Sequence, residues 1–263
     1  MKTLGVLCLL AVISLSLNSC HGLFDNDEEC TSCNQGQGTL KGNVLTVDST
    51  GMALDDLAGT VVTITGTTYS NVTTTGINGK WQFDHVPAGI YQFSFDKPGY
   101  GGVKKYDFQF VGNGTLNMDS IYIGRAPKFA VEISSLTLDA DQLVVRITSA
   151  EPSTFQKRSV LVVSKKPTPS PLDSSNYCVA QVGGVSPTGG DFTHFEGVIF
   201  MTPLRERFHT GDTCYVAAFG LGNIYHIDYY NGYFPSTYQN PITGSNIYTA
   251  TGPSSNVLQF TMP

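Results

Sequence analysis

The chain has 263 residues, of which 41% are hydrophobic and 11% aromatic, enough to form the core of one large or two ordinary domains. Its formal net charge is -6, and it has no run of Lys or Arg long enough to follow a phosphate backbone, so nucleic acid is not an expected partner. Charged residues make up only 14%, while 28 Gly and 13 Tyr favour short strands and tight turns. The composition therefore predicts an all-β protein.

The N-terminal segment has the features of an export signal. Lys2 supplies one positive charge, and residues 4–17 form an apolar run that is short for a membrane span but suits the hydrophobic region of a signal peptide. We therefore expect residues 1–19 to be a signal peptide.

The end of this run resembles a bacterial lipobox. The sequence Leu17-Asn18-Ser19-Cys20 places an aliphatic residue three positions before a cysteine and a small residue directly before it, although Asn18 departs from the usual pattern. The resemblance implies that the mature protein begins at Cys20, which carries the lipid, and that two or three acyl chains together anchor it stably. The alternative is cleavage by ordinary signal peptidase, which gives a free secreted protein.

Residues 20–37 are expected to form a solvated tether. They contain the acidic stretch 25–29, which resembles the surface-export signal of Bacteroidetes lipoproteins. The implied location is the outer membrane, with the protein facing either the cell surface or the periplasm.

The six cysteines indicate how many disulfides the exported protein could form. Cys8 leaves with the signal peptide and Cys20 takes the lipid, so four thiols remain in an oxidising compartment. Of three possible pairings we favour Cys30 with Cys33 and Cys178 with Cys214. Cys30 and Cys33 have redox spacing, but no helix is predicted after them to lower a thiol pKa, so a structural role is favoured.

Residues 38–124 predict a first β-domain. Alternating β-branched and aromatic residues separated by turns indicate strands at 40–47, 60–65, 69–75, 90–95, 103–111 and 115–123, with Trp81 and Phe83 sharing one face. Asn78-Gly79 supplies a hairpin turn.

This stretch resembles the carboxypeptidase regulatory-like family. The resemblance is carried by Gly42 with Val44 and by the segments 75–83 (TGINGKWQF), 86–91 (VPAGIY) and 97–100 (KPGY). It implies a prealbumin-like sandwich of about seven strands that acts as a spacer or docking unit. It implies no hydrolase, because the zinc enzyme of carboxypeptidases is a separate domain and no HxxE motif precedes this one.

Residues 125–263 predict a second β-domain. Ala126-Pro127 marks the boundary, and strands are expected at 129–133, 143–147, 160–164, 177–182, 194–201, 213–221 and 256–262. Segments 195–199 and 211–219, with Leu204, resemble a fibronectin type III or immunoglobulin-like sandwich.

Residues 222–248 form an expected long loop that is rich in aromatic residues. Exposed rings there would suit a glycan or a protein partner, and the alternative is that they extend a hairpin or cover the end of the sandwich. The candidate binding residues are Tyr225, Tyr229, Tyr230, Tyr233, Phe234 and Tyr238.

No motif for a hydrolase, metalloprotease, nucleotide or dinucleotide site is present, so neither catalytic residues nor a cofactor are predicted. His226 and Asp228 give a weak metal signal, and we predict no metal site. The leading interpretation is a non-catalytic, lipid-anchored envelope protein that binds a glycan or protein partner through its distal domain. The alternatives are a structural spacer in an envelope complex and a hydrolase with dispersed residues, for example Asp55 and Asp56.

Two short segments suggest modification. Asp48-Ser49-Thr50 and Asp119-Ser120-Ile121 resemble the tripeptide at which Bacteroidetes attach O-glycans, so Ser49 and Ser120 are candidate acceptors.

Overall fold

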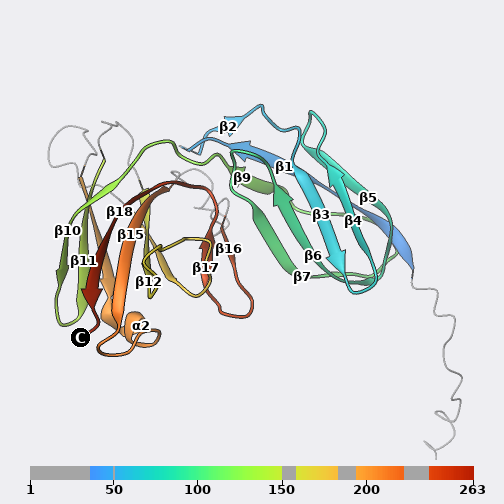
Figure 1. Ribbon diagram of the computed structural model, residues 1–263. Coiled ribbons are helices and arrows are strands. Elements are labelled where there is room, and N and C mark those ends of the chain that lie inside the picture. Colours follow the sequence, from blue (N-terminus) through green and yellow to red (C-terminus); the bar gives the residue numbers. More distant parts are fainter. Residues whose placement is uncertain (1–35, 50, 150–157, 183–193, 222–236) are drawn as a thin grey trace, which may run out of the picture. The chain divides into compact units, whose positions relative to one another are not determined.

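The computed structural model describes residues 36–49, 51–149, 158–182, 194–221 and 237–263 (Figure 1). In these ranges nearly all regular structure is strand, and the strands form facing sheets with apolar side chains between them. The predicted all-β, sandwich-type fold is confirmed. The signal peptide, the tether and Cys20, Cys30 and Cys33 lie outside the described residues. Within those ranges, no helix is both long enough and apolar enough to cross a bilayer.

Strand β1 (Gln37–Val47) organises the first part of the chain. Its N-terminal half pairs antiparallel with β5 (Lys80–Pro87) and parallel with β8 (Gly114–Asn117). Its C-terminal half pairs antiparallel with β2 (Ala53–Leu54) and parallel with β9 (Ile121–Gly124). One strand therefore joins four others into a single sheet (Figure 1).

The facing sheet is antiparallel and has the order β4-β3-β6-β7. Its strands are β3 (Val61–Gly66), β4 (Ser70–Thr74), β6 (Gly89–Asp96) and β7 (Val103–Phe110). Alternate residues of both sheets point inward, and Trp81, Phe93 and Phe95 lie at the centre of the core between them.

The turns follow the sequence prediction. Gly79 has a φ of 75°, and its amide donates to the carbonyl of Gly76 over 2.9 Å, which closes the predicted turn before β5. Gly112 and Gly114 also have positive φ in the predicted turn before β8.

The single strand expected at 115–123 is two strands. Asn117 pairs with Lys41, and Ile121 pairs with Val44. Between these two pairs the chain advances four residues from β8 to β9 but only three along β1. Met118 occupies the break, where it is buried and its amide donates to the carbonyl of Lys41 over 2.8 Å. The extra residue interrupts the ladder, as in a β-bulge.

The second part of the chain has a sheet of order β10-β11-β14 and a sheet of order β13-β12-β15-β18, with a core between them. The strands are β10 (Glu132–Leu138), β11 (Gln142–Thr148), β12 (Arg158–Ser164), β13 (Tyr177–Val182), β14 (His194–Phe200), β15 (Thr213–Leu221) and β18 (Thr251–Thr261). A short helix, α2 (Met201–Arg205), follows β14 and places Met201 and Leu204 in this core.

The central strands of the larger sheet are covered on both faces. Leu161 and Val163 of β12 belong to the main core, whereas Val160 and Val162 pack on the opposite face with Tyr248. Tyr248 ends β17 (Asn246–Tyr248), which pairs with β16 (Thr237–Gln239). The described part of the expected loop at 222–248 is thus a hairpin with a buried end, as in the alternative interpretation. The division into domains at residues 124 and 125 remains a prediction.

Candidate binding site

A polar hollow of about 650 Å³ opens on the first sandwich, within the range of about 300–1,000 Å³ that ligand sites occupy. Strands β1, β4 and β5 and the end of β8 supply its walls, and β4 lies beside β5. It is lined by Lys41, Gly42, Asn43, Thr73, Thr74, Lys80, Trp81, Gln82, Asn117 and Met118.

Strand alternation explains this lining. Across the β1–β5 ladder, Lys41 lies opposite Gln82, and Asn43 lies opposite Lys80. Side chains alternate along a strand, and the neighbouring Leu40 and Val44 are buried in the core. The four polar side chains therefore point away from the core. Parallel pairing with β8 adds Asn117 beside Lys41. Amides and ammonium groups from three strands therefore share one face.

Gly42 and Trp81 belong to the inward-facing set beneath these polar side chains. The two residues pair across the ladder, and a Cβ at position 42 would lie 2.6 Å from Cζ2 of Trp81. The indole needs the space that glycine leaves. Its ring centroid lies 5.8 Å from that of Phe93 and 5.9 Å from that of Phe95, and the side chain is only 3% exposed. Trp81 thus offers no exposed face for stacking.

Two polar atoms of the lining have no partner among the described residues. They are the Nε1–H of Trp81 and the Oδ1 of Asn43, both buried. A buried polar atom without a partner costs about 1–3 kcal/mol, so native structures seldom leave one unless water or a ligand supplies the hydrogen bond. The hollow that both residues line is a space from which such a partner can come.

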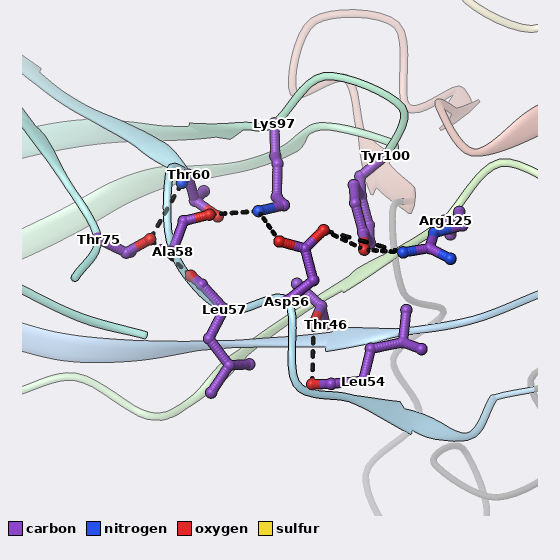
Figure 2. Close-up of polar contacts among 10 residues, drawn as sticks. All are labelled: Thr46, Leu54, Asp56, Leu57, Ala58, Thr60, Thr75, Lys97, Tyr100 and Arg125. Carbon is purple, nitrogen blue, oxygen red and sulfur yellow. Dashed lines mark hydrogen bonds and ion pairs between the residues drawn. The ribbon is translucent and has the colours of Figure 1, made fainter. Parts of the chain in front are cut away.

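A second polar cluster lies at another place on the same sandwich (Figure 2). The ammonium of Lys97 donates to Oδ1 of Asp56 over 2.9 Å and also to the carbonyl of Ala58, and its side chain is 8% exposed. The hydroxyl of Tyr100 donates to Oδ2 of Asp56 over 2.9 Å and accepts from Arg125 over 2.8 Å.

These hydrogen bonds hold the pKa of Asp56 below its usual value, with Lys97 contributing most and Tyr100 next. The side chains of Asp56, Lys97, Tyr100 and Arg125 all take part in these bonds, which join the loop after β2, the turn after β6 and the residue after β9. We therefore assign the cluster a structural role and name it the Lys97 clasp. The carboxylate of Asp56, one of the two residues named as an example of a dispersed hydrolase site, is bound by Lys97 and Tyr100 in the clasp.

The predicted disulfide between Cys178 and Cys214 is wrong. Both thiols are free, on strands β13 and β15, which β12 separates. Two strand spacings amount to about 10 Å, beyond the roughly 7 Å over which a disulfide can connect Cα atoms. The two side chains also point to opposite faces, since Cys178 packs with Val162 and Cys214 packs in the main core.

Most of the aromatic candidates, Tyr225, Tyr229, Tyr230, Tyr233 and Phe234, lie outside the described residues, as do His226 and Asp228. Tyr238 is described. It is half-buried, its ring centroid lies 6.2 Å from that of Tyr106, and the ammonium of Lys104 lies 5.6 Å from its centroid. Burial raises the pKa of Tyr238.

The two candidate O-glycan acceptors have different environments. Ser120 is exposed between β8 and β9, and Ser49 is half-buried in the turn after β1. Both remain predictions. Among the residues that the structure describes, no group of three or more His, Cys, Asp or Glu side chains is placed to hold a metal ion.

Sequence reasoning missed the hollow. Most of its residues are ordinary polar residues from four different strands, so no motif marks them. The sequence feature that could have pointed to this region is a glycine and a tryptophan on neighbouring strands. Gly42 pairs with Trp81 and leaves space for its ring.

No family model matches the chain, and no curated protein is similar to it in sequence. Among solved structures, a candidate carbohydrate-binding protein from Bacteroides uniformis is 13% identical with a TM-score of 0.29, and the match covers 86% of this chain and 99% of that one. A DUF3823 family protein from Parabacteroides merdae is 12% identical with a TM-score of 0.32, covering 86% and 99%. Another from Bacteroides ovatus is 9% identical with a TM-score of 0.29, covering 86% and 100%. These similarities are too distant to assign a function.

Proposed function

We propose that this protein is a non-catalytic, lipid-anchored component of the bacterial cell envelope and that its hollow binds a glycan. The observation that carries the proposal is a polar hollow of ligand size whose lining includes two buried polar atoms that no described residue satisfies. The lipid at Cys20 and the outer-membrane location rest on the lipobox-like sequence.

The chemistry of the lining favours a sugar over an apolar ligand. Amides of Asn43, Gln82 and Asn117 both donate and accept hydrogen bonds, as do the hydroxyls of Thr73 and Thr74. Sugar hydroxyls likewise donate and accept, so each contact can be made in either direction. Apart from Gly42, Trp81 and Met118, every residue of the lining carries an amide, a hydroxyl or an ammonium group that can bind a sugar hydroxyl.

The test is binding of the purified full chain to an immobilised glycan panel, with two variants on the same strand. Asn117→Ala removes an exposed amide that lines the hollow, and we expect it to weaken binding by about 3- to 10-fold, the effect of losing one hydrogen bond. Thr115→Ala is the matched control. Thr115 is also exposed on β8, two residues away, but does not line the hollow, and its loss should leave binding unchanged.

Equal loss in both variants, or in neither, would place the glycan elsewhere on the protein. No binding to any member of the panel would reject the glycan proposal.

A further inference from the structure

We propose that the ligand of the hollow is an acidic glycan, one that carries a carboxylate or a sulfate. This inference rests on the proposed function and names the class of sugar. It is carried by Lys41 and Lys80, which line the hollow from adjacent strands.

The register places the two lysines within reach of one group. Lys41 pairs with Gln82, and Lys80 lies two residues before Gln82 on the same face of β5, so the lysines are diagonal neighbours. Diagonal neighbours in an antiparallel ladder lie about 7–8 Å apart. Two side chains of that length and spacing can converge on one anionic group or hold successive groups along a chain.

Neither ammonium has a carboxylate partner among the described residues. The other lysines near acidic side chains do: Lys97 pairs with Asp56, Lys165 with Asp212 and Lys166 with Asp173. Because the whole chain has a net charge of -6, attraction of an anion cannot be a general property of its surface. Any preference for an acidic ligand has to arise from a local pair such as this one.

Asp84 is the acidic residue that follows on the same face of β5, and neutral hydrogen-bond donors hold it in its ionised form. It accepts hydrogen bonds from Nε2 of Gln82 at 2.8 and 3.0 Å and from Thr39 at 2.9 Å, which lower its pKa. Asp84 does not line the hollow. The carboxylate of Asp84 limits the hollow's anion-binding region on one side. The acidic group of the ligand should therefore lie toward Lys80.

The neutral part of the lining argues for a glycan rather than a small inorganic anion. Asn43 presents an unpartnered acceptor, its Oδ1, which needs a donated hydrogen; a sulfate ion carries none near neutral pH, and a phosphate ion carries only one or two. A sugar supplies hydroxyl donors for that oxygen and acidic oxygens for the lysines in one molecule.

The experiment measures binding of the full chain to matched neutral and acidic glycans. Oligogalacturonate is compared with its methyl ester, and sulfated dextran oligosaccharide with unsulfated dextran, beside a broad panel of neutral glycans. Binding should be confined to acidic members and should weaken as ionic strength rises. Lys41→Gln and Lys80→Gln should each reduce affinity about two- to fivefold, as the loss of an exposed ion pair does, and the two Lys→Arg variants should retain it.

The control removes the same number of charges elsewhere. Lys128→Gln combined with Lys166→Gln changes two exposed lysines of the second part of the chain and should leave binding unchanged. Binding of methyl-esterified or unsulfated glycans equal to that of the acidic forms, with no effect of Lys41→Gln or Lys80→Gln, would overturn the acidic class and leave glycan binding standing. Acidic glycans bound equally by the Lys→Gln and control variants would also overturn it. Failure to bind any glycan would reject both proposals.

Discussion

Two glycines of the first sandwich separate the cost of a left-handed backbone conformation from the cost of a steric clash. Gly79 and Gly99 have nearly the same positive φ, 75° and 79°. A Cβ at Gly79 would lie 2.3 Å from the carbonyl oxygen of Val44, whereas a Cβ at Gly99 would have nothing within 4 Å.

We therefore expect Gly99→Ala to lower the free energy of unfolding by about 1–2 kcal/mol, the cost of the left-handed conformation. Gly79→Ala should cost more, because backbone must also move. Urea denaturation of both variants checks this. Equal losses of unfolding free energy in the two variants would mean that the backbone of β1 moves aside at no energetic cost.

The two described cysteines should be unreactive thiols in the folded protein. Burial raises the pKa of Cys178 to about 12 and that of Cys214 to about 11. Since the thiolate is the reactive form, alkylation at pH 8 should be at least about a hundredfold slower than for an ordinary thiol of pKa about 8.5. Mass spectrometry after timed iodoacetamide labelling, native and in urea, measures the ratio. A Cys178–Cys214 peptide in a non-reducing digest would contradict the structure.

At the scale of elements, the Lys97 clasp joins three connections of the first sandwich. Lys97→Met keeps the aliphatic stem but leaves the carbonyl of Ala58 without its charged donor. Hydrogen bonds to charged groups contribute about 1.5–3 kcal/mol, and the Lys97 side chain is only 8% exposed, so we expect a loss in that range. Lys128→Met, at an exposed lysine, is the control. Thermal melting that does not distinguish the two variants would show that the clasp adds nothing to stability.

Strand prediction succeeded where one face of a strand is solvated. Leu143, Val145 and Ile147 alternate with more polar positions, and β11 is buried at these three residues. It placed a strand at 160–164, within β12, but not the burial of both faces of that strand, because its six consecutive buried residues show no alternation. It also missed the break at Met118, which depends on how two strands share β1.

The error about the cysteines has the same origin. Their sequence separation and compartment favoured a disulfide, but the face on which each thiol lies depends on strand register. A shift of one residue reverses the face, and sequence alone does not give the register between β12, β13 and β15. The hollow was hidden for a related reason, since Lys41, Lys80 and Asn117 become neighbours only through pairing.

At the scale of the whole molecule, the proposed lipid anchor at Cys20 predicts where the protein is found. Changing Cys20 to Ala removes the only thiol of the lipobox-like sequence, so fatty-acid labelling should disappear and the protein should leave the membrane fraction. Labelling with a fatty-acid analogue followed by fractionation tests this. Persistent labelling of the Cys20→Ala variant would reject the lipobox interpretation, and release of an unlabelled wild-type protein would support ordinary secretion.

The parallel pairing of β1 with β8 and β9 has a mechanical consequence. A pull transmitted through the preceding segment reaches the chain at the start of β1, whereas the connection to the following strands leaves from the end of β9. Forces applied at opposite ends of parallel neighbours slide one strand along the other, so the ladder bonds are loaded together in shear instead of opening one after another. The first sandwich is thus oriented to resist extension along β1 when force is applied through the chain segments before β1 and after β9.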